Sequence, residues 1–453
     1  MRVRQTRRSR WIERLAHPAR LSIGSFLLMI ALGTVLLSFP AAREGPDSAP
    51  LSVALFTSTS AVCVTGLVVV DTPGYWTTFG ETVVMVLMQI GGFGVMTLAS
   101  VLSLIAFRRL ALRHRLVAQR ETRSFGLAEL RQVLLGVLIF TAFFETILFV
   151  VLFTRLTTTY GVDVPRAAYE ALFHAVSAFN NAGFSLYSDS LERFVADAWV
   201  MLPVALTIIA GGIGFPVLTE LRRCPTRPKQ WSIHTKLTIG TTIVLLVAGT
   251  VGIAFLEWTN PSTLGEFTTN GKLLPSFFHS VTSRTAGFDA FGVADMEETS
   301  WLLTCVLMFI GGGSAGTAGG IKVTTFALLG FMMWAEAQGE PYVNVWARRV
   351  PGGAQRQALT VALLAIGAVV LGTLIIMSLG SFPLGDAMFE SFSAFGTVGL
   401  STGITGELSA GGRLVVMVLM FAGRLGPITL ATALALRTRE RKYKHPKEQP
   451  IIG

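Results

Sequence analysis

The sequence predicts an all-α polytopic membrane protein with eight transmembrane helices, arranged as four helix–loop–helix repeats around a pseudo-fourfold axis. Three observations support this fold class. First, 51% of the 453 residues are hydrophobic and only 14% are charged, whereas soluble domains carry about 25% charged residues. Second, the basic residues gather in a few patches beside long apolar runs. Third, one short motif occurs four times along the chain.

The formal net charge of +10 does not indicate a nucleic-acid-binding protein, because 28 of the 37 Lys and Arg residues lie in five patches. Each patch adjoins a long apolar run, which is the distribution found in the cytoplasmic loops of membrane proteins. The composition also excludes a disordered chain and an ordinary cytosolic enzyme. The expected environment is therefore a lipid bilayer. The patches lie at residues 1–20, 108–131, 222–236, 348–356 and 437–447.

Crossing a hydrocarbon core of about 30 Å takes about 20 apolar residues, and eight segments meet this requirement. An even number of spans places both termini on one side of the membrane. The basic patches fall at the two ends and after every second span, so that side is predicted to be the cytoplasm. The spans lie at approximately 21–39, 82–107, 132–154, 198–219, 237–256, 299–335, 357–379 and 414–436.

The connections on the opposite side each contain an apolar stretch that is too short to cross a bilayer. Backbone that re-enters a membrane persists only where protein or a water-filled cavity surrounds it. We therefore expect the order span, re-entrant segment, span, four times over, around a central pore. The re-entrant segments are 51–65, 167–182, 273–286 and 385–398. The pore repeats cover 21–107, 132–220, 237–336 and 357–436, between a basic N-terminus (1–20), linkers (108–131, 221–236, 337–356) and a C-terminal tail (437–453).

Each re-entrant segment carries the same motif: a phenylalanine, a hydroxyl residue four positions later, and a closing glycine. About 25 residues further on, a glycine cluster is expected to interrupt the second span of the repeat. Such coordinated recurrence indicates an internal repeat. The phenylalanines are Phe56, Phe173, Phe278 and Phe389; the hydroxyl residues are Ser60, Ser177, Thr282 and Ser393; the glycines are Gly66, Gly183, Gly287 and Gly399. The clusters begin at Gly91, Gly211, Gly311 and Gly423.

The repeated geometry predicts a site for a cation. A short helix that ends in mid-membrane directs its C-terminal carbonyls, with about half a negative charge, at the bilayer centre. Glycine then lets the chain turn back, because it reaches positive φ without a steric penalty. Four such turns would present rings of backbone oxygens that replace the hydration shell of a cation, as in potassium-channel filters.

The sixth span is predicted to be broken. Residues 299–335 would form one helix about 55 Å long, but its middle contains a glycine-rich stretch that is unfavourable in a helix. We expect an unwound loop inside the membrane, below the filter, where it would act as a gate; a helix kink without a gating role is the alternative. The loop consists of Gly311, Gly312, Gly313, Ser314, Ala315, Gly316, Thr317, Ala318, Gly319 and Gly320.

Two charges, Lys322 and Arg424, are predicted at a similar depth. Charged residues inside a membrane usually mark a pathway or a paired switch. They would repel cations or hold the loop through its carbonyls, and a helix-locking salt bridge to Glu145 is the alternative. Arg284 is expected to pair with an acid such as Glu390.

An enzyme is not expected. Residues 312–316 match the pattern G-x-S-x-G, but that motif needs a strand–turn–helix context and catalytic partners. An intramembrane protease would need a histidine facing Ser314. His174 and His279 occupy equivalent positions in two repeats, which favours a capping role over a metal site.

The four motifs, the glycine-rich loop and the sequence GRLGP from Gly423 resemble the TrkH/KtrB/HKT superfamily of potassium transporters, over essentially the whole chain from Leu21. The number of spans and the short tail resemble a KtrB-type subunit most. The resemblance implies a homodimer in the bacterial inner membrane with both termini cytoplasmic, a cytosolic KtrA-type nucleotide-binding ring, and potassium uptake stimulated by sodium. It implies no cofactor in this subunit.

The same resemblance implies which residues bind the ion. The presence of all four glycines favours potassium over sodium, and the gate would comprise the loop with Arg424. The filter carbonyls would belong to Val64, Thr65 and Gly66; Asn181, Ala182 and Gly183; Thr285, Ala286 and Gly287; and Thr397, Val398 and Gly399. A coupled symporter of potassium with sodium or a proton remains the alternative, with Glu145 as the acid that supports it.

Overall fold

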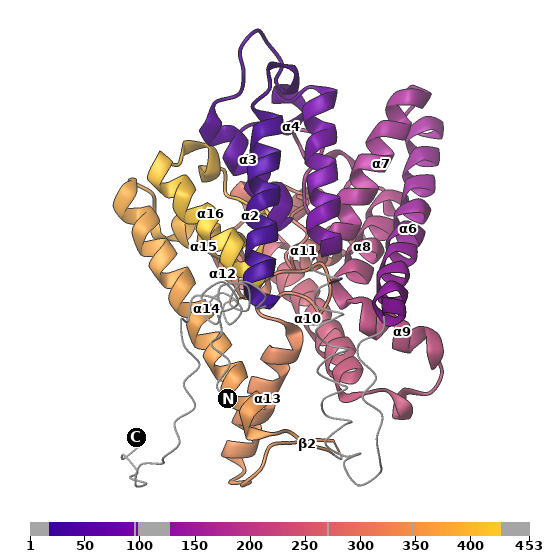
Figure 1. The fold of residues 1–453 in the computed structure, drawn as a ribbon, viewed down its shortest axis with the longest axis vertical. Coiled ribbons are helices and arrows are strands. Elements are labelled where there is room, and N and C mark those ends of the chain that lie inside the picture. The colour runs from indigo at the N-terminus through magenta and orange to yellow at the C-terminus, as the bar shows by residue number, and fades with distance from the viewer. Residues whose placement is uncertain (1–17, 95–96, 98–126, 270, 347, 427–453) are drawn as a thin grey trace, which may run out of the picture.

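The computed structural model describes residues 18–94, 97, 127–269, 271–346 and 348–426, and it is mostly helical (Figure 1). The helices of the first half are α2 (Pro18–Leu37), α3 (Leu51–Cys63), α4 (Thr72–Tyr75), a helix over residues 78–94, α6 (Leu127–Thr158), α7 (Val164–Asn180), α8 (Ala198–Ile213) and α9 (Phe215–Arg223). Those of the second half are α10 (Ile233–Glu257), α11 (Leu273–Thr282), α12 (Glu298–Phe309), α13 (Val323–Ala337), α14 (Gly352–Leu379), α15 (Leu384–Gly396) and α16 (Ala410–Leu425). Six single 3-10 turns and the strands β1 (Asn344–Val345) and β2 (Arg348–Arg349) complete the described part.

The helices close into a ring in chain order. A long helix packs on the short helix that follows it in four places: α2 on α3, α6 on α7, α10 on α11 and α14 on α15. The helix after each short one reaches the next copy, since α8 packs on α11, α12 on α15, and α16 returns to α3. The helix at 78–94 reaches α7 through the Tyr169 hydroxyl, which donates to Glu81 Oε2 at 2.9 Å.

The repeated phenylalanines form the core around this ring. Phe56, Phe173, Phe278 and Phe389 are all 0% exposed. Burying a phenylalanine side chain stabilises a fold by about 1.5–3 kcal/mol. The first two belong to one hydrophobic cluster and the last two to another. The motif therefore recurs because each short helix needs the same anchor.

Three helices in the described residues are long and apolar enough to cross a membrane: α6 from Arg131, α10 and α14. The predicted span 198–219 is not one straight helix, because α8 and α9 meet at an angle of 100°. The bend lies at Gly214, whose φ is +97°, and Pro216 follows at the start of α9. The ends of the predicted spans 82–107 and 414–436 lie outside the described residues.

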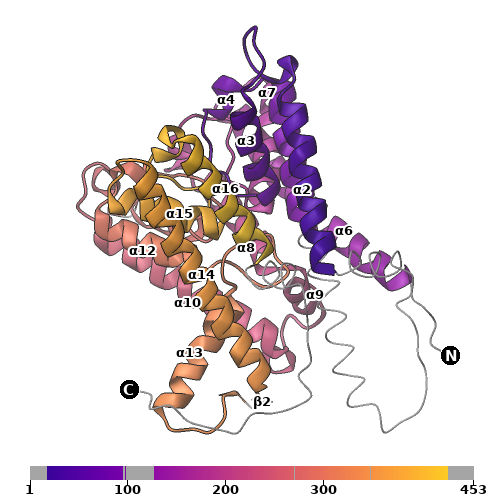
Figure 2. The ribbon, with the colours of Figure 1, turned by 60° about the vertical axis from the view of Figure 1, so that its left-hand side comes forward.

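The sixth predicted span has the expected break, since α12 ends at Phe309 and α13 begins at Val323. α13 and the β1–β2 hairpin project from one end of the molecule in both views (Figure 2). The prediction of a purely helical chain omitted this hairpin, in which Asn344 pairs with Arg349 and Val345 with Arg348. Strands of two residues are too short to produce a recognisable alternating pattern.

Candidate functional site

Each short helix is followed by a turn of the same unusual shape. The residue two positions before the repeat glycine has positive φ in all four copies: Val64 (55°), Asn181 (59°), Thr285 (85°) and Thr397 (50°). The glycines themselves also have positive φ, between 69° and 100°. Non-glycine residues seldom adopt this conformation, and backbone strain of this kind gathers at functional sites.

The four glycines, Gly66, Gly183, Gly287 and Gly399, lie against one another in a closed cycle, here called the glycine ring. A Cβ built on each would come within 3.0–3.1 Å of the Cα of the next, and Gly399 returns to Gly66. The same Cβ atoms would also collide with the carbonyl oxygens of Ala182, Ala286, Val398 and Thr65, in that order. We call residues 64–66, 181–183, 285–287 and 397–399 ring segments 1 to 4.

Most of the backbone N–H groups of the ring segments bond back to their own short helices. Thr65 N donates to Ser60 O at 2.8 Å, and Val398 N donates to Ser393 O at 2.9 Å. The side chains of these two serines also accept from Gly66 N and Gly399 N, each at 3.1 Å. Because the donors are used in this way, the carbonyls of the segments are left as acceptors, which is the polarity that a cation requires.

The second and third motif hydroxyls show where the copies differ. Ser177 donates instead to Phe184 O at 2.8 Å. Thr282 Oγ1 is buried and has no hydrogen-bond partner within the described part of the chain, although the Thr282 carbonyl accepts from Ala286 N at 2.9 Å. The third short helix is one residue tighter at this point, which matches the shorter spacing seen in its sequence.

The glycine clusters do not interrupt three of the helices that carry them, contrary to the prediction. The helices at 78–94, α8 and α16 continue through Gly91, Gly211 and Gly423. A Cβ on these glycines would collide with the carbonyls of Val62, Phe179 and Phe395, each four residues before a ring glycine. Glycine is therefore required for close approach of the helix to the ring and not for a break.

The glycine-rich loop, residues 311–320, lies directly against the ring. Gly311 N donates to Ile321 O at 2.9 Å, and Val323 N to Gly312 O at 3.0 Å, so the loop is closed at its base. Its outer part is fixed to α8, because Gly313 N donates to Gly212 O at 2.8 Å and Thr317 N to Gly211 O at 3.1 Å. The loop thus has a defined hydrogen-bonded shape.

Both predicted charges bind the loop. Arg424 donates through Nη1 to Thr317 O and through Nη2 to Gly91 O at 3.4 Å. Lys322 donates through Nζ to Ala318 O. The alternative of a salt bridge to Glu145 is wrong for the described residues, since Glu145 accepts instead from Asn180 Nδ2 at 3.3 Å.

Arg284 does not pair with Glu390, contrary to the prediction. The carboxylate of Glu390 accepts from the hydroxyls of Ser401, at 2.8 Å, and Thr405, at 2.5 Å. Arg284 Nη2 donates to Gly311 O at 3.1 Å, at the start of the loop. Burial of a guanidinium against backbone carbonyls was not evident from sequence spacing.

The nucleophile pattern at residues 312–316 has no catalytic partner in the described part of the chain. The Ser314 hydroxyl lies 3.1 Å from Thr324 Oγ1. His279 contacts Thr304 Oγ1 at 3.1 Å instead. No group of three or more metal-ligating side chains occurs among the described residues.

Comparison with known proteins identifies the family that has this architecture. The TrkH family of cation transport proteins matches residues 18–445. The chain belongs to this family. It is 38% identical to "Ktr system potassium uptake protein B" of Bacillus subtilis over 98% of both chains, and 38% identical to the protein of the same name from Vibrio alginolyticus over 96% of this chain and 94% of that one. The family is one of transport proteins and not of enzymes.

A solved structure shares the fold of this TrkH-family chain. The potassium transporter TrkH from Vibrio parahaemolyticus matches with a TM-score of 0.70 and 19% sequence identity, over 91% of this chain and 85% of that one. At this identity the likeness concerns the fold alone.

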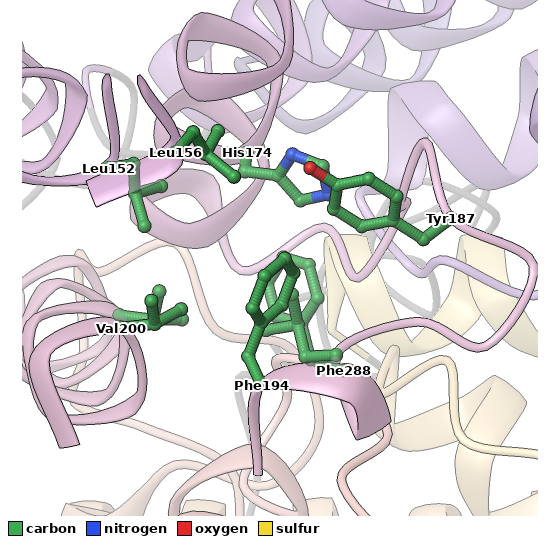
Figure 3. Close-up of a pocket in the computed structure, with 9 residues that line it drawn as sticks. Leu152, Leu156, His174, Tyr187, Phe194, Val200 and Phe288 are labelled. Carbon is green, nitrogen blue, oxygen red and sulfur yellow. The ribbon is translucent and has the colours of Figure 1, made fainter. Parts of the chain in front are cut away.

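Two side-chain networks that support ring segment 2 of this TrkH-family chain were not predicted from the sequence. His174 lies inside α7 and does not cap it: Nδ1 contacts Glu170 O at 2.7 Å and Nε2 contacts Ser185 Oγ at 3.0 Å, two residues after Gly183. Its ring stacks on Tyr187 beside a cavity of about 20 Å³ (Figure 3). That space holds at most one water molecule, and the contacts of His174 fix the chain that leaves the ring.

The second network joins the helix at 78–94, α6 and α7. Asn180 Nδ2 donates to Gln89 Oε1 at 2.7 Å and to Glu145 Oε1 at 3.3 Å. Glu145 therefore lies in the wall behind ring segment 2. The spacing of these three residues in the sequence gives no periodic signal, because they come from three different helices.

The connection between ring segment 2 and α8 gives a pH-dependent prediction. Burial and the nearby carboxylates of Asp289 and Asp189 raise the pKa of Glu192 to about 7. An acid whose pKa is raised by folding stabilises the fold below its unfolded pKa, and this contribution is lost as the pH rises to about 7. Glu192→Gln should therefore raise the melting temperature at pH 8 relative to the unmodified protein, with the difference shrinking below pH 4.5.

The exposed residue Glu407 supplies a matched control. Glu407→Gln should leave the melting temperature nearly unchanged at both pH values, since surface substitutions usually alter stability by less than about 0.5 kcal/mol. An equal gain at pH 4.5 and pH 8 for Glu192→Gln would contradict the assigned electrostatic cause.

Proposed function

We propose that this chain is the ion-translocating membrane subunit of a gated, channel-like potassium uptake system. The closed glycine ring carries the proposal, because it brings four sets of backbone carbonyls together around one axis. The eight non-glycine residues of the ring segments are buried, so the ring lies inside the protein and not at its surface. In this proposal the twelve residues of ring segments 1 to 4 are the potassium selectivity filter, and the eight spans form four pore-loop repeats around it.

The names of the relatives support potassium as the ion. Both proteins at 38% identity are described as potassium uptake proteins. A relative from Enterococcus hirae at 33% identity is described as a potassium/sodium uptake protein. We therefore propose potassium as the transported ion and sodium as an activator.

The glycine-rich loop is the proposed gate. It lies next to the ring, and its carbonyls accept hydrogen bonds from Lys322 and Arg424. Two cations beside a cation pathway oppose ion passage while the loop holds them there. Movement of the loop would displace the obstruction and break the hydrogen bonds that hold both charges beside it.

The proposed assembly follows the relatives' designation as members of a Ktr system. We propose a homodimer in the bacterial inner membrane, with both termini in the cytoplasm and a cytosolic KtrA-type nucleotide-binding ring as regulator. The basic loop at 108–123 and the basic C-terminal tail at 437–453, which lie outside the described residues, are the proposed contacts for that ring.

Rubidium uptake into proteoliposomes tests this function. We expect uptake to proceed down a rubidium gradient when the sodium gradient has been dissipated, because a filter of neutral carbonyls requires no co-transported ion. Added sodium should change the rate without fixing the ratio of ions moved. Vesicles without protein control for leakage, and vesicles with the Gly287→Ser variant show whether uptake depends on the proposed filter.

A strict ratio of sodium or protons moved per rubidium ion would contradict the pore. That result would support the coupled symporter, with Glu145 as the first residue to test. Absence of any rubidium uptake, with the protein folded and inserted, would contradict both.

A further inference from the structure

The glycine-rich loop contacts three of the four ring segments, so the loop and the ring form one bonded unit. Thr317 reaches segment 2, Gly311 reaches segment 3, and Gly319 reaches segment 4. A loop that only obstructed the pathway would need none of these contacts. These contacts indicate that the loop also supports the shape of the ring.

Arg284 makes the link to segment 3. It directly precedes Thr285, the first residue of that segment, and only 7% of it is exposed. Its guanidinium donates to Gly311 O at 3.1 Å and to Thr242 O of α10 at 3.4 Å. Nε has no hydrogen-bond partner, and none of the three ion pairs in the described residues includes Arg284. Its charge is therefore balanced mainly by the loop carbonyl.

Asn181 makes the link to segment 2 and extends it to segment 3. One end of its side-chain amide lies 3.2 Å from Thr317 Oγ1, and the other lies 3.2 Å from Thr285 Oγ1. Thr317 Oγ1 also donates to Phe179 O at 3.3 Å. The Thr317 hydroxyl of the loop is thus connected through the Asn181 amide to ring segments 2 and 3.

Segment 4 is held by close packing. A Cβ on Gly319 would collide with Thr397 Oγ1 and would lie 2.9 Å from Gly396 O. A Cβ on Gly311 would lie 3.3 Å from Thr285 Cγ2. If the loop left this position, the sides of segments 3 and 4 that now contact Gly311 and Gly319 would lose their packing partners.

We propose that Arg284 and Thr317 are positioning residues that couple ion selectivity to the state of the loop. This inference rests on the proposed filter and gate. Through their bonds to Gly311 and Thr317 of the loop, Arg284 and the Asn181 amide hold segments 2 and 3 at the spacing that favours potassium. A variant that lacks one of these contacts relaxes that spacing and discriminates less against sodium among the ions that it conducts. Since coupling between two sites is reciprocal, potassium in the filter also stabilises the loop in its closed position.

Thr317→Val tests the coupling from the loop side, because it removes one hydroxyl and keeps the side-chain volume. We expect the ratio of rubidium to sodium uptake in proteoliposomes to fall about three- to tenfold, the range for loss of one hydrogen bond. Thr317→Ser keeps the hydroxyl and should restore the ratio. Thr373→Val is the matched control, since the Thr373 hydroxyl is buried in α14 and, among the described residues, bonds to Val369 O of its own helix alone.

Arg284→Gln tests the coupling from the ring side and should lower the same ratio, with Arg284→Lys intermediate because it keeps the charge but loses the planar fork. If the Arg284 variants do not fold, Thr317→Val decides the question. A rise in flux with an unchanged ratio in Thr317→Val would overturn the coupling, and so would an equal fall in Thr373→Val. If Gly287→Ser also leaves the ratio unchanged, the filter assignment itself is wrong; if Gly287→Ser lowers it and Thr317→Val does not, only the coupling fails.

Discussion

Replacing Gly287 by serine should lower the discrimination between rubidium and sodium at least about tenfold, which corresponds to about 1.4 kcal/mol. Gly287 has a φ of +78°, and a Cβ there would collide with Val398 O and lie 3.1 Å from Gly399 Cα. The left-handed conformation alone costs a non-glycine residue about 1–2 kcal/mol. The added side chain would push segment 4 away from segment 3. Uptake of each ion, measured separately in proteoliposomes, checks this result.

Gly403→Ser is the matched control for this substitution. Gly403 also has positive φ, at +104°, but a Cβ there would meet nothing within 4 Å. It carries the same conformational strain without the collision, and it lies outside the ring. Equal loss of selectivity in the two variants would show that strain, and not the shape of the ring, is responsible. An unchanged ratio in Gly287→Ser would contradict the four-glycine filter.

Deleting residues 314–316 should raise rubidium flux at least about tenfold, or about 1.4 kcal/mol in the barrier to passage. The deletion leaves the base of the loop intact, because Gly311 N still donates to Ile321 O and Val323 N to Gly312 O. It shortens the chain that carries Thr317 toward Arg424, so the obstruction and its bound charge would be drawn aside. Initial rates of rubidium uptake check the result.

A deletion of equal length in an exposed connection provides the control. Residues 45–47, between α2 and α3, are exposed, and their removal should leave the flux near that of the unmodified protein. A 314–316 deletion that inserts normally but does not change the flux would remove the gate assignment. A deletion that increases flux and lowers selectivity together is expected if the loop also supports the ring.

The repeated architecture could be predicted from sequence because its signals are local. Phe56 and its three equivalents each stand four residues before a hydroxyl and nine or ten before a glycine, and this spacing produces the same short helix, buried anchor and turn. The break in the sixth span was equally visible, since several glycines in succession oppose a helix. These features depend on neighbours within one segment.

The features that sequence reasoning missed depend on contacts between segments. Glycine is required at Gly91, Gly211 and Gly423 because the end of another helix lies against each of them. No local pattern shows which part of the chain approaches a glycine. The same reason explains Arg284, whose carbonyl partners are 27 and 42 residues away in sequence. Burial against backbone oxygens leaves no acidic partner in the sequence to pair it with.

The glycine ring is encoded in one chain, and this distinguishes it from a ring assembled from four identical subunits. In a symmetric tetramer a single codon change alters all four positions at once. Here a substitution alters only one of the four ring segments. Selection can therefore change each segment independently, and the four segments can acquire different functions. Asn181 and Thr285 already differ from Val64 in this way, because their polar side chains bond to each other across two quadrants. In a ring built from one chain, segments 2 and 3 can therefore respond to the loop while segment 1 serves only to complete the ring.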